Sequence, residues 1–184
     1  MPRKHGPWII KKSRTAYQNP WFKLREDEVI QPNGKHSVHV VIEDYGGANV
    51  LPLDKDGYVY LADEFKYGLG RHDLNTATGG INPKETPLSA AKRELKEELG
   101  ITAKKWTKLG IVHCYTSISD SPSYLFLAQG LTFGPTEHEG TESIQPRKIK
   151  FNQAVKMVFA NKITHAPTVV AILKAREYLK SAAK

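Results

Sequence analysis

The chain has 184 residues, of which 40% are hydrophobic and 25% are charged, and its formal net charge is +8 at pH 7. This length suffices for a sizeable core in one globular domain, and the absence of an apolar run of about 20 residues excludes a transmembrane helix. The charge favours anionic partners such as phosphates, nucleotides or nucleic acid, but the scattered lysines indicate a solvated surface rather than a nucleic-acid-binding tract.

The N-terminal segment and the cysteine content predict the location of the protein. Residues 1–12 are basic but lack the apolar core and the small-residue cleavage site of a secretory signal. Cys114 is the only cysteine, which excludes an intramolecular disulfide and a cysteine-cluster zinc site. We therefore expect a cytoplasmic protein. Cys114 itself lies in an apolar, strand-like stretch, where we expect a small buried side chain.

The first half of the chain is predicted to form antiparallel strands. Asn33-Gly34 is a strong hairpin signal between two of them, and Lys55-Asp56-Gly57 is a second turn. The next segment, 66–80, contains several glycines and is expected to be a loop. The strand-like segments are 8–17, 22–32, 37–44, 48–54 and 57–65.

The second half is predicted to contain one well-delimited helix, more strands and two final helices. Thr86 is a plausible N-cap, Pro87 suits the first helical position, and Gly100 suits a left-handed C-terminal cap. The order of strands, helix, strands and helices indicates an α+β fold. Beyond Gly100 the expected strands are 108–117, 123–133 and 144–151, and the expected helices are 152–162 and 168–184.

Three carboxylates of the predicted helix, Glu94, Glu97 and Glu98, border its apolar stripe. The stripe consists of Leu88, Ala91, Leu95 and Leu99 when residues are placed about 100° apart. Two charges about 4 Å apart repel by roughly 1 kcal/mol in water and roughly 4 kcal/mol at an effective dielectric constant of 20. A solvated acidic face with i,i+4 lysine partners is the simpler interpretation. A bound divalent cation is the alternative, because magnesium takes oxygen ligands from a few carboxylates.

The spacing of these acids resembles the Nudix box. The box is a glycine, five residues, a glutamate, seven residues, and then Arg-Glu-apolar-any-Glu-Glu-any-Gly-apolar. All nine defined positions match: Gly79, Glu85, Arg93, Glu94, Leu95, Glu97, Glu98, Gly100 and Ile101. The resemblance implies an α/β/α sandwich with a mixed β-sheet, and hydrolysis of a nucleoside diphosphate linked to another moiety.

The resemblance also implies roles for individual residues. Glu94 and Glu98 would be ligands of Mg²⁺, with Mn²⁺ as an alternative ion, and Glu97 would be a further ligand or would act through water at the metal. The backbone carbonyl of Thr78 would complete the set. Arg93 would orient Glu97 or Glu85, and Glu85 would be largely structural. The metals would neutralise and position the diphosphate and lower the pKa of the attacking water.

Segments outside the box resemble the ADP-ribose and nucleoside diphosphate sugar pyrophosphatase branch. These segments are 19–35, 50–71 and 161–177. In that branch an N-terminal sheet helps to form a homodimer. We therefore expect residues 1–44 to be an antiparallel extension for dimerisation and base binding, and residues 45–184 to be the hydrolase domain.

Several residues are candidates for substrate contact. Tyr17, Trp21 and Phe22 could stack a base, with core packing as the alternative. Lys66 and Arg71 could bind phosphate, with a surface role as the alternative for Arg71 and for its neighbour His72. Because Glu64-Phe65-Lys66 replaces the Gln-Tyr-Arg of many members, a forked guanidinium becomes a point charge. A substrate range that includes GDP-mannose is therefore expected.

An acidic loop follows the last long strand and carries Glu137, Glu139 and Glu142. Related enzymes supply a metal ligand or general base from such a loop, and we favour Glu142 and then Glu139. A merely solvated loop is the alternative. The leading functional hypothesis is a pyrophosphatase for ADP-ribose and related nucleotide sugars, with no membrane partner. The other hypotheses are hydrolysis of dinucleoside polyphosphates or capped RNA, and a non-catalytic nucleotide sensor.

Overall fold

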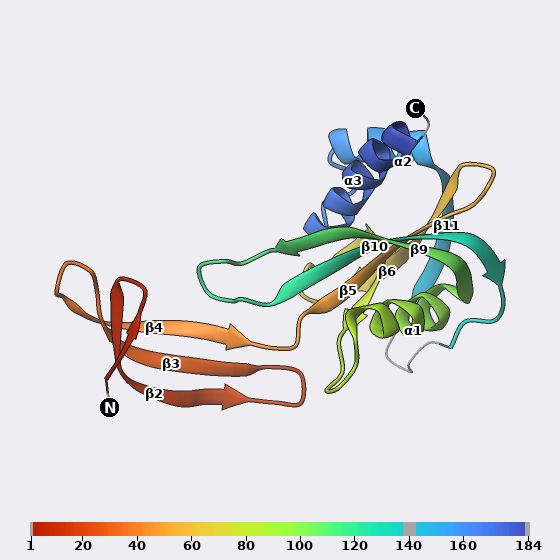
Figure 1. Ribbon diagram of the computed structural model, residues 1–184. Coiled ribbons are helices and arrows are strands. Elements are labelled where there is room, and N and C mark those ends of the chain that lie inside the picture. The colour runs from red at the N-terminus through yellow and green to blue at the C-terminus, as the bar shows by residue number, and fades with distance from the viewer. Residues whose placement is uncertain (1, 138–142, 183–184) are drawn as a thin grey trace. The chain divides into compact units, whose positions relative to one another are not determined.

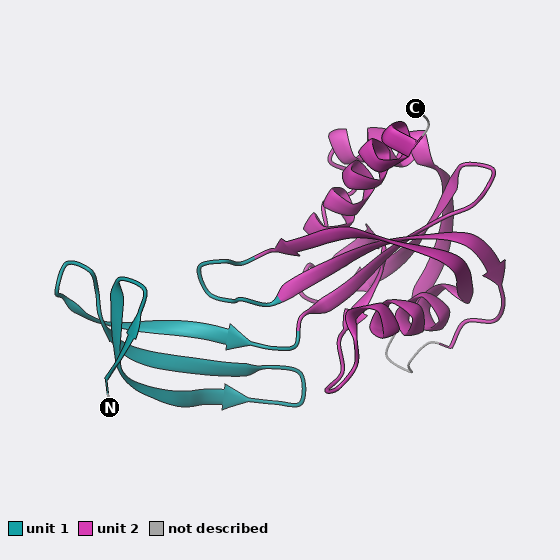
Figure 2. Cartoon of the chain, viewed as in Figure 1, with its two compact units in different colours: residues 1–45, 115–121 teal, residues 46–114, 122–184 magenta. Residues whose placement is uncertain are grey.

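The computed structural model describes residues 2–137 and 143–182, which fall into two compact units (Figure 2). The first unit comprises residues 1–45 and 115–121, and the second comprises residues 46–114 and 122–184. The short segment 115–121 therefore belongs with the N-terminal strands and not with the strands that flank it in the sequence. None of the described helices has the length and hydropathy of a membrane span.

The first unit is built on an antiparallel sheet with the strand order β1-β2-β3-β4. The predicted hairpin at Asn33-Gly34 is confirmed, because the Gly34 N–H donates to the Gln31 carbonyl at 2.9 Å and Gly34 has a φ of 80°. Among its described apolar side chains, only Ile10 and Val29 are fully buried. The strands are β1 Arg3–His5, β2 Trp8–Gln18, β3 Lys23–Ile30 and β4 His36–Glu43.

The second unit is a mixed seven-stranded sheet between helices. The strand order is β11-β6-β5-β10-β9, with β7 on β6 and β8 on β5, and the β5–β10 pair is parallel. Its strands are β5 Gly47–Leu53, β6 Tyr58–Lys66, β7 Arg71–Asn75, β8 Ala77–Gly80, β9 Ile101–His113, β10 Pro122–Phe133 and β11 Ile144–Lys150. Its helices are α1 Pro87–Leu99, α2 Phe151–Phe159 and α3 Ala166–Ala182.

The helices of this unit cover opposite faces of the sheet (Figure 1). Leu95 and Leu99 of α1 pack with Val50 and Phe126 in one buried cluster. On the other face, α2 and α3 pack in a second cluster that includes Leu51 and Leu61. Because neighbouring residues of a strand point to opposite faces, Val50 and Leu51 enter different clusters. This is the α/β/α sandwich with a mixed sheet that the sequence predicts, and it is confirmed.

Several details of the sequence prediction are wrong. The segment 66–80 is not a loop, because it contains β7 and β8. Its buried side chains include Asp73, Asn75 and Thr76, and such polar residues hide the apolar alternation of a strand. Cys114 is exposed, since it follows the last residue of β9. Leu88 is 37% exposed and lies outside the buried stripe.

Candidate functional site

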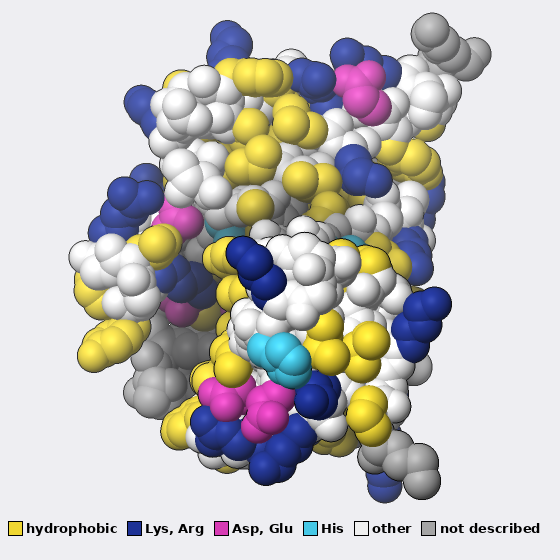
Figure 3. Space-filling model, turned by 90° about the vertical axis from the view of Figure 1, so that its left-hand side faces the viewer, with side chains coloured by type: hydrophobic (Ala, Val, Ile, Leu, Met, Phe, Trp, Pro, Cys, Tyr) yellow, Lys and Arg dark blue, Asp and Glu magenta, His cyan; other side chains and the backbone are white. Residues whose placement is uncertain are grey.

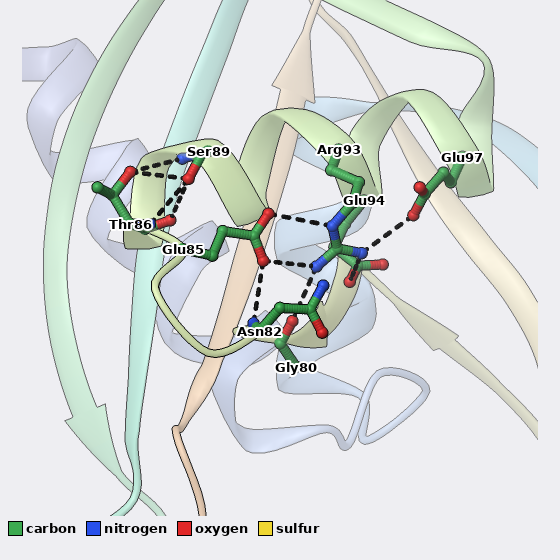
Figure 4. Close-up of polar contacts among 8 residues, drawn as sticks. All are labelled: Gly80, Asn82, Glu85, Thr86, Ser89, Arg93, Glu94 and Glu97. Carbon is green, nitrogen blue, oxygen red and sulfur yellow. Dashed lines mark hydrogen bonds and ion pairs between the residues drawn. The ribbon is translucent and has the colours of Figure 1, made fainter. Parts of the chain in front are cut away.

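Helix α1 begins and ends as its capping residues predict. The Ser89 N–H donates to Thr86 Oγ1 at 3.1 Å, and the Thr86 N–H donates to Ser89 Oγ at 2.9 Å, which completes a capping box (Figure 4). Pro87 occupies the first turn, and Gly100 adopts a left-handed φ of 63°. These caps fix the limits of the helix and therefore the direction in which its three acids project.

Two of the three acids are buried. Glu94 is 8% exposed and Glu98 is 3% exposed, whereas the Glu97 side chain is 34% exposed. Glu94 and Glu98 are one helical turn apart, so their side chains lie on the same side of α1. A solvated acidic face is therefore excluded for these two residues, and the prediction that the acids border the core is confirmed.

The glycine of the box is required by its contact with Glu94. A Cβ atom placed on Gly79 would collide with the Glu94 carboxylate, whereas one on the adjacent Gly80 would meet nothing within 4 Å. Strand β8 therefore passes directly beneath this acid. The spacing between the glycine and the helix reflects this close approach of backbone to carboxylate.

Arg93 is the hub of the polar contacts around α1 (Figure 4). Its Nε and Nη2 donate to the two Glu85 oxygens at 3.1 and 3.0 Å, and Nη2 also donates to the Gly80 carbonyl at 2.9 Å. Its Nη1 donates to Glu94 Oε1 at 2.6 Å and to Glu97 Oε2 at 3.0 Å. The bonds to Glu85 are the main reason why the pKa of Arg93 is raised and that of Glu85 is lowered. Arg93 thus contacts both of the acids that the resemblance assigns to it.

Glu98 is bonded to the backbone of β8 and is protonated at neutral pH. Burial raises the pKa of Glu98 to about 9, and the charges of Glu94 and Glu64 act in the same direction. A hydrogen bond from the Thr78 N–H to Glu98 Oε2 at 3.0 Å and the charge of Lys66 oppose the rise. The unfavourable ionisation of Glu98 is thus a consequence of placing a carboxyl group in the interior beside other acids.

The residues around Glu98 suit a hard divalent cation in chemistry and charge. Glu94, Glu97 and Glu98 offer carboxylate oxygens, and the carbonyl of Thr78 is a candidate fourth donor, because the backbone of that residue lies against Glu98. A cation would offset the repulsion between the two buried acids. In residues 2–137 and 143–182, however, no three acidic, His or Cys side chains converge as a metal site. The guanidinium of Arg93 bonds one oxygen of Glu94, Oε1, and one oxygen of Glu97, Oε2.

The predicted phosphate-binding residues lie on the β6–β7 hairpin. Lys66 forms an ion pair with Glu64, and its charge acts on Glu98, so it lies close to the acids. Arg71 pairs with Lys66 across the hairpin and is exposed. The neighbouring His72 places Nδ1 3.0 Å from Asp63 Oδ1. The structure thus brings Lys66 into electrostatic contact with Glu98.

The predicted base-stacking residues belong to the first unit and are exposed. Tyr17, Trp21 and Phe22 are 54%, 78% and 37% exposed, so packing in the core of the described chain is excluded for them. The rings of Tyr17 and Phe22 lie 5.8 Å apart. Residues 18–23 and 43–45 line a cavity of about 300 Å³ in this unit.

Only one acid of the predicted acidic loop lies within the described residues. The Glu137 N–H donates to the Glu97 carbonyl at 2.9 Å, and the Glu137 carboxylate pairs with Lys96 at 2.8 Å. The loop therefore begins beside the C-terminal turn of α1. Glu139 and Glu142 lie outside the described residues.

Several buried polar residues near the site were not predicted. Asn49 Oδ1 accepts from Thr78 Oγ1 at 2.8 Å, and Thr168 bonds Thr76 across a separation of 92 residues. The side-chain amide of Asn75 is buried and has no hydrogen-bond partner among the described residues. The sequence marks these residues only as polar positions within or next to strand-like segments, because contacts between distant residues leave no local pattern.

Comparison with known proteins gives two domain matches that together cover most of the chain. Residues 45–164 match the NUDIX domain, and residues 8–42 match the nucleoside diphosphate sugar hydrolase N-terminal domain. The chain is 29% identical over 162 residues to an ADP-ribose pyrophosphatase of Bacillus subtilis (strain 168), covering 86% of this chain and 88% of the relative. It is 30% identical over 133 residues to the ADP compounds hydrolase NudE of Escherichia coli (strain K12), covering 71% and 70% respectively.

The fold comparison agrees with these matches. A crystal structure of an ADP compounds hydrolase superposes with a TM-score of 0.82 at 24% identity, covering 98% of this chain and 95% of the other. The matched NUDIX segment contains the whole box, including the buried acids of α1 and the glycine beneath them. The chain belongs to the Nudix hydrolase family and carries an N-terminal domain of the nucleoside diphosphate sugar hydrolase type.

Proposed function

We propose that this Nudix hydrolase cleaves the diphosphate of ADP-ribose and other nucleoside diphosphate sugars, including GDP-mannose, in a reaction that requires Mg²⁺ or Mn²⁺. The observation that carries the proposal is the pair of buried carboxylates, Glu94 and Glu98, which a chain would not retain in its interior for stability alone. The match of residues 8–42 to a nucleoside diphosphate sugar hydrolase domain supports the substrate class.

Each residue has a definite task in this proposal. Thr78, Glu94, Glu97 and Glu98 hold the cation. When bound, Mg²⁺ neutralises charge on the diphosphate and makes water a stronger nucleophile. Arg93 positions the carboxylates that it contacts. Lys66 and Arg71 bind phosphate oxygens.

Hydrolysis of the diphosphate by water needs no covalent enzyme intermediate. Water forms a new bond to one phosphorus, and the bridging oxygen leaves with the other phosphate. A carboxylate of Glu97, Glu142 or Glu139 accepts the proton of the water. The products are a nucleoside monophosphate and a sugar phosphate.

The first unit supplies base binding and dimerisation in this proposal. Tyr17, Trp21 and Phe22 expose aromatic surface that can stack a base. Few of its described side chains are fully buried, so a second copy of the chain would give the sheet the partner surface that it lacks. The homodimer is tested by light scattering at micromolar protein, where a monomeric mass would contradict it. With a single cysteine, the chain suits a reducing compartment such as the cytoplasm.

Dinucleoside polyphosphates or capped RNA are a second candidate substrate class, favoured by the net charge of +8. On the face drawn in Figure 3, however, Lys and Arg side chains are scattered among apolar ones. This face does not favour a long nucleic acid over a small anionic substrate.

The test is incubation of the purified protein and Mg²⁺ with ADP-ribose, GDP-mannose, diadenosine polyphosphate and capped RNA, followed by identification of the products. We expect a nucleoside monophosphate and a sugar phosphate from the first two. Glu98→Gln should lower turnover by orders of magnitude, whereas Lys92→Gln, which neutralises an exposed charge on the same helix, should not. Cleavage of only the last two substrates would move the protein to the second class, and no cleavage at all would indicate a nucleotide sensor.

A further inference from the structure

The start of helix α3 is tied to the strand segment beside Glu98 by a buried hydroxyl group. Thr168, in the first turn of α3, is fully buried, and so is Thr76, which lies between β7 and β8. The Thr76 N–H donates to Thr168 Oγ1 at 2.9 Å, and the two hydroxyl oxygens are 3.1 Å apart. His165 Nδ1 lies 2.9 Å from the same Thr168 oxygen.

These three contacts use the full bonding capacity of the Thr168 hydroxyl. A hydroxyl group has one proton to donate and two lone pairs that accept. Thr168 Oγ1 accepts the Thr76 N–H, and its contacts with Thr76 Oγ1 and His165 Nδ1 can use its own proton and its second lone pair. Burial lowers the pKa of His165, and the Lys66 charge adds to this effect, which favours the neutral ring. The Thr168 hydroxyl therefore has no unused bonding capacity. Its loss would leave the buried Thr76 N–H without this acceptor.

The segment held by Thr168 is the one that contacts Glu98. Thr78 follows Thr76 by two residues, and its N–H donates to Glu98 Oε2 at 3.0 Å. The charge of Lys66 lowers the pKa of both Glu98 and His165, so this lysine lies within electrostatic reach of both groups. Helices α1 and α3 cover opposite faces of the sheet, so this segment is held from both sides (Figure 1).

Strand β8 needs such support. It has only four residues, its described pairing is with β5 alone, and two of its residues are Gly79 and Gly80. A Cβ atom at Gly79 would meet the Glu94 carboxylate, which would have to move. Since glycine has the greatest backbone freedom, the orientation of the Thr78 N–H depends on the contacts of Thr78 with Asn49 of β5 and on those made just before it.

We propose that Thr168 is a positioning residue for Glu98, which it orients through the segment from Thr76 to Thr78. The inference rests on the proposed function only in taking Glu98 as a ligand of the metal. Removal of the hydroxyl should let the Thr78 N–H move, and Glu98 would then lose the bond that holds its carboxyl group in place.

The experiment compares Thr168→Val, which removes the hydroxyl at nearly constant volume, with Thr168→Ser, which keeps it. Tyr60→Phe is the matched control, because it removes a hydroxyl bonded to Asp54 Oδ2 at 2.9 Å in the same unit but far from β8 in the sequence. Mn²⁺ affinity is measured by electron paramagnetic resonance without substrate, together with kcat, KM and thermal unfolding in EDTA.

We expect Thr168→Val to weaken Mn²⁺ binding and to lower kcat by about 10-fold or more, as is usual for groups that orient metal ligands. KM for the nucleotide sugar should change little. Thr168→Ser should restore the affinity, and Tyr60→Phe should lose stability but keep wild-type Mn²⁺ affinity. If Thr168→Val does not fold, Thr168→Cys, which bonds more weakly at similar volume, replaces it in the comparison.

The outcomes separate this inference from the proposed function. Wild-type Mn²⁺ affinity in a folded Thr168→Val protein overturns the inference, and so does an equal loss of affinity in Tyr60→Phe. If the wild type binds Mn²⁺ in a Thr168-dependent manner but hydrolyses no nucleotide sugar, the proposed function fails and the inference stands. Absence of Mn²⁺ binding in the wild type would overturn both.

Discussion

Replacement of Glu98 by glutamine should abolish activity and at the same time stabilise the metal-free protein. The folded-state pKa of Glu98 is about 9, compared with an ordinary value of 4.5. Between these two pH values the folded protein holds a proton that the unfolded chain releases, so stability falls as the pH rises through this window. Below pH 4.5 both states are protonated and the effect disappears.

The size of the effect follows from the distance between the working pH and the ordinary pKa. Each pH unit above 4.5 lowers the free energy of unfolding of the wild type by about 1.4 kcal/mol, so at pH 7 it is lower by about 3 kcal/mol. Glutamine does not ionise, and its side-chain oxygen can still accept the Thr78 N–H that now bonds Glu98. Metal-free Glu98→Gln should therefore be more stable than the wild type by about 3 kcal/mol at pH 7, and no more stable well below pH 4.5.

Urea unfolding in EDTA at several pH values tests this reasoning. Glu97→Gln is the control, because that side chain is about one-third exposed and is bonded to Arg93, and it should give no such gain. In saturating Mg²⁺ the wild type should be more stable than Glu98→Gln. A ligand that binds only the folded state stabilises it, and we expect Glu98→Gln to bind Mg²⁺ poorly. A gain that is equal at pH 5 and pH 8, or no gain at all, would refute the assignment of Glu98 as a buried, protonated acid.

Three further changes should have measurable effects. Gly79→Ala should force its new Cβ into the Glu94 carboxylate and destabilise the protein by about 1–3 kcal/mol in urea unfolding, whereas Gly80→Ala, with open space at its Cβ, should not produce this clash. Arg93→Lys should reduce kcat by about 10-fold or more, because an ammonium group cannot make the five directed bonds of the guanidinium; near-normal kinetics would contradict this role. Since burial lowers the pKa of His165 below 6.5, its contribution to stability should be present above that pH and lost on acidification, and His165→Asn should weaken this pH dependence of unfolding.

Helix α1 and its acids could be predicted because their signals are local. Thr86, Pro87 and Gly100 mark the ends of the helix through their own backbone preferences. The acids then follow from helical spacing, which places Glu94 and Glu98 one turn apart. The antiparallel extension could be predicted for a similar reason, since Asn-Gly specifies a tight turn between neighbouring strands.

Strands β7 and β8 could not be predicted, because their burial depends on partners far away in the chain. Thr76, between these two strands, is buried where it bonds Thr168, and Thr78 of β8 bonds the buried Asn49 of β5. Polar residues and glycines read as a loop when the sequence is considered locally. The same physics explains the wrong expectation for Cys114, whose apolar neighbours belong to β9 while the cysteine itself follows the strand and is exposed.

The structure neutralises its buried acids in two different ways in the absence of metal. Glu94 and Glu97 share the Nη1 group of Arg93, whereas Glu98 accepts from the Thr78 backbone and keeps its proton. A divalent cation bound by Glu98 would displace its proton, because a ligand carboxyl group must be deprotonated. The arrangement therefore tolerates three acids on adjacent turns without metal, at a cost in stability. Binding of a cation would recover that cost in the proposed enzyme.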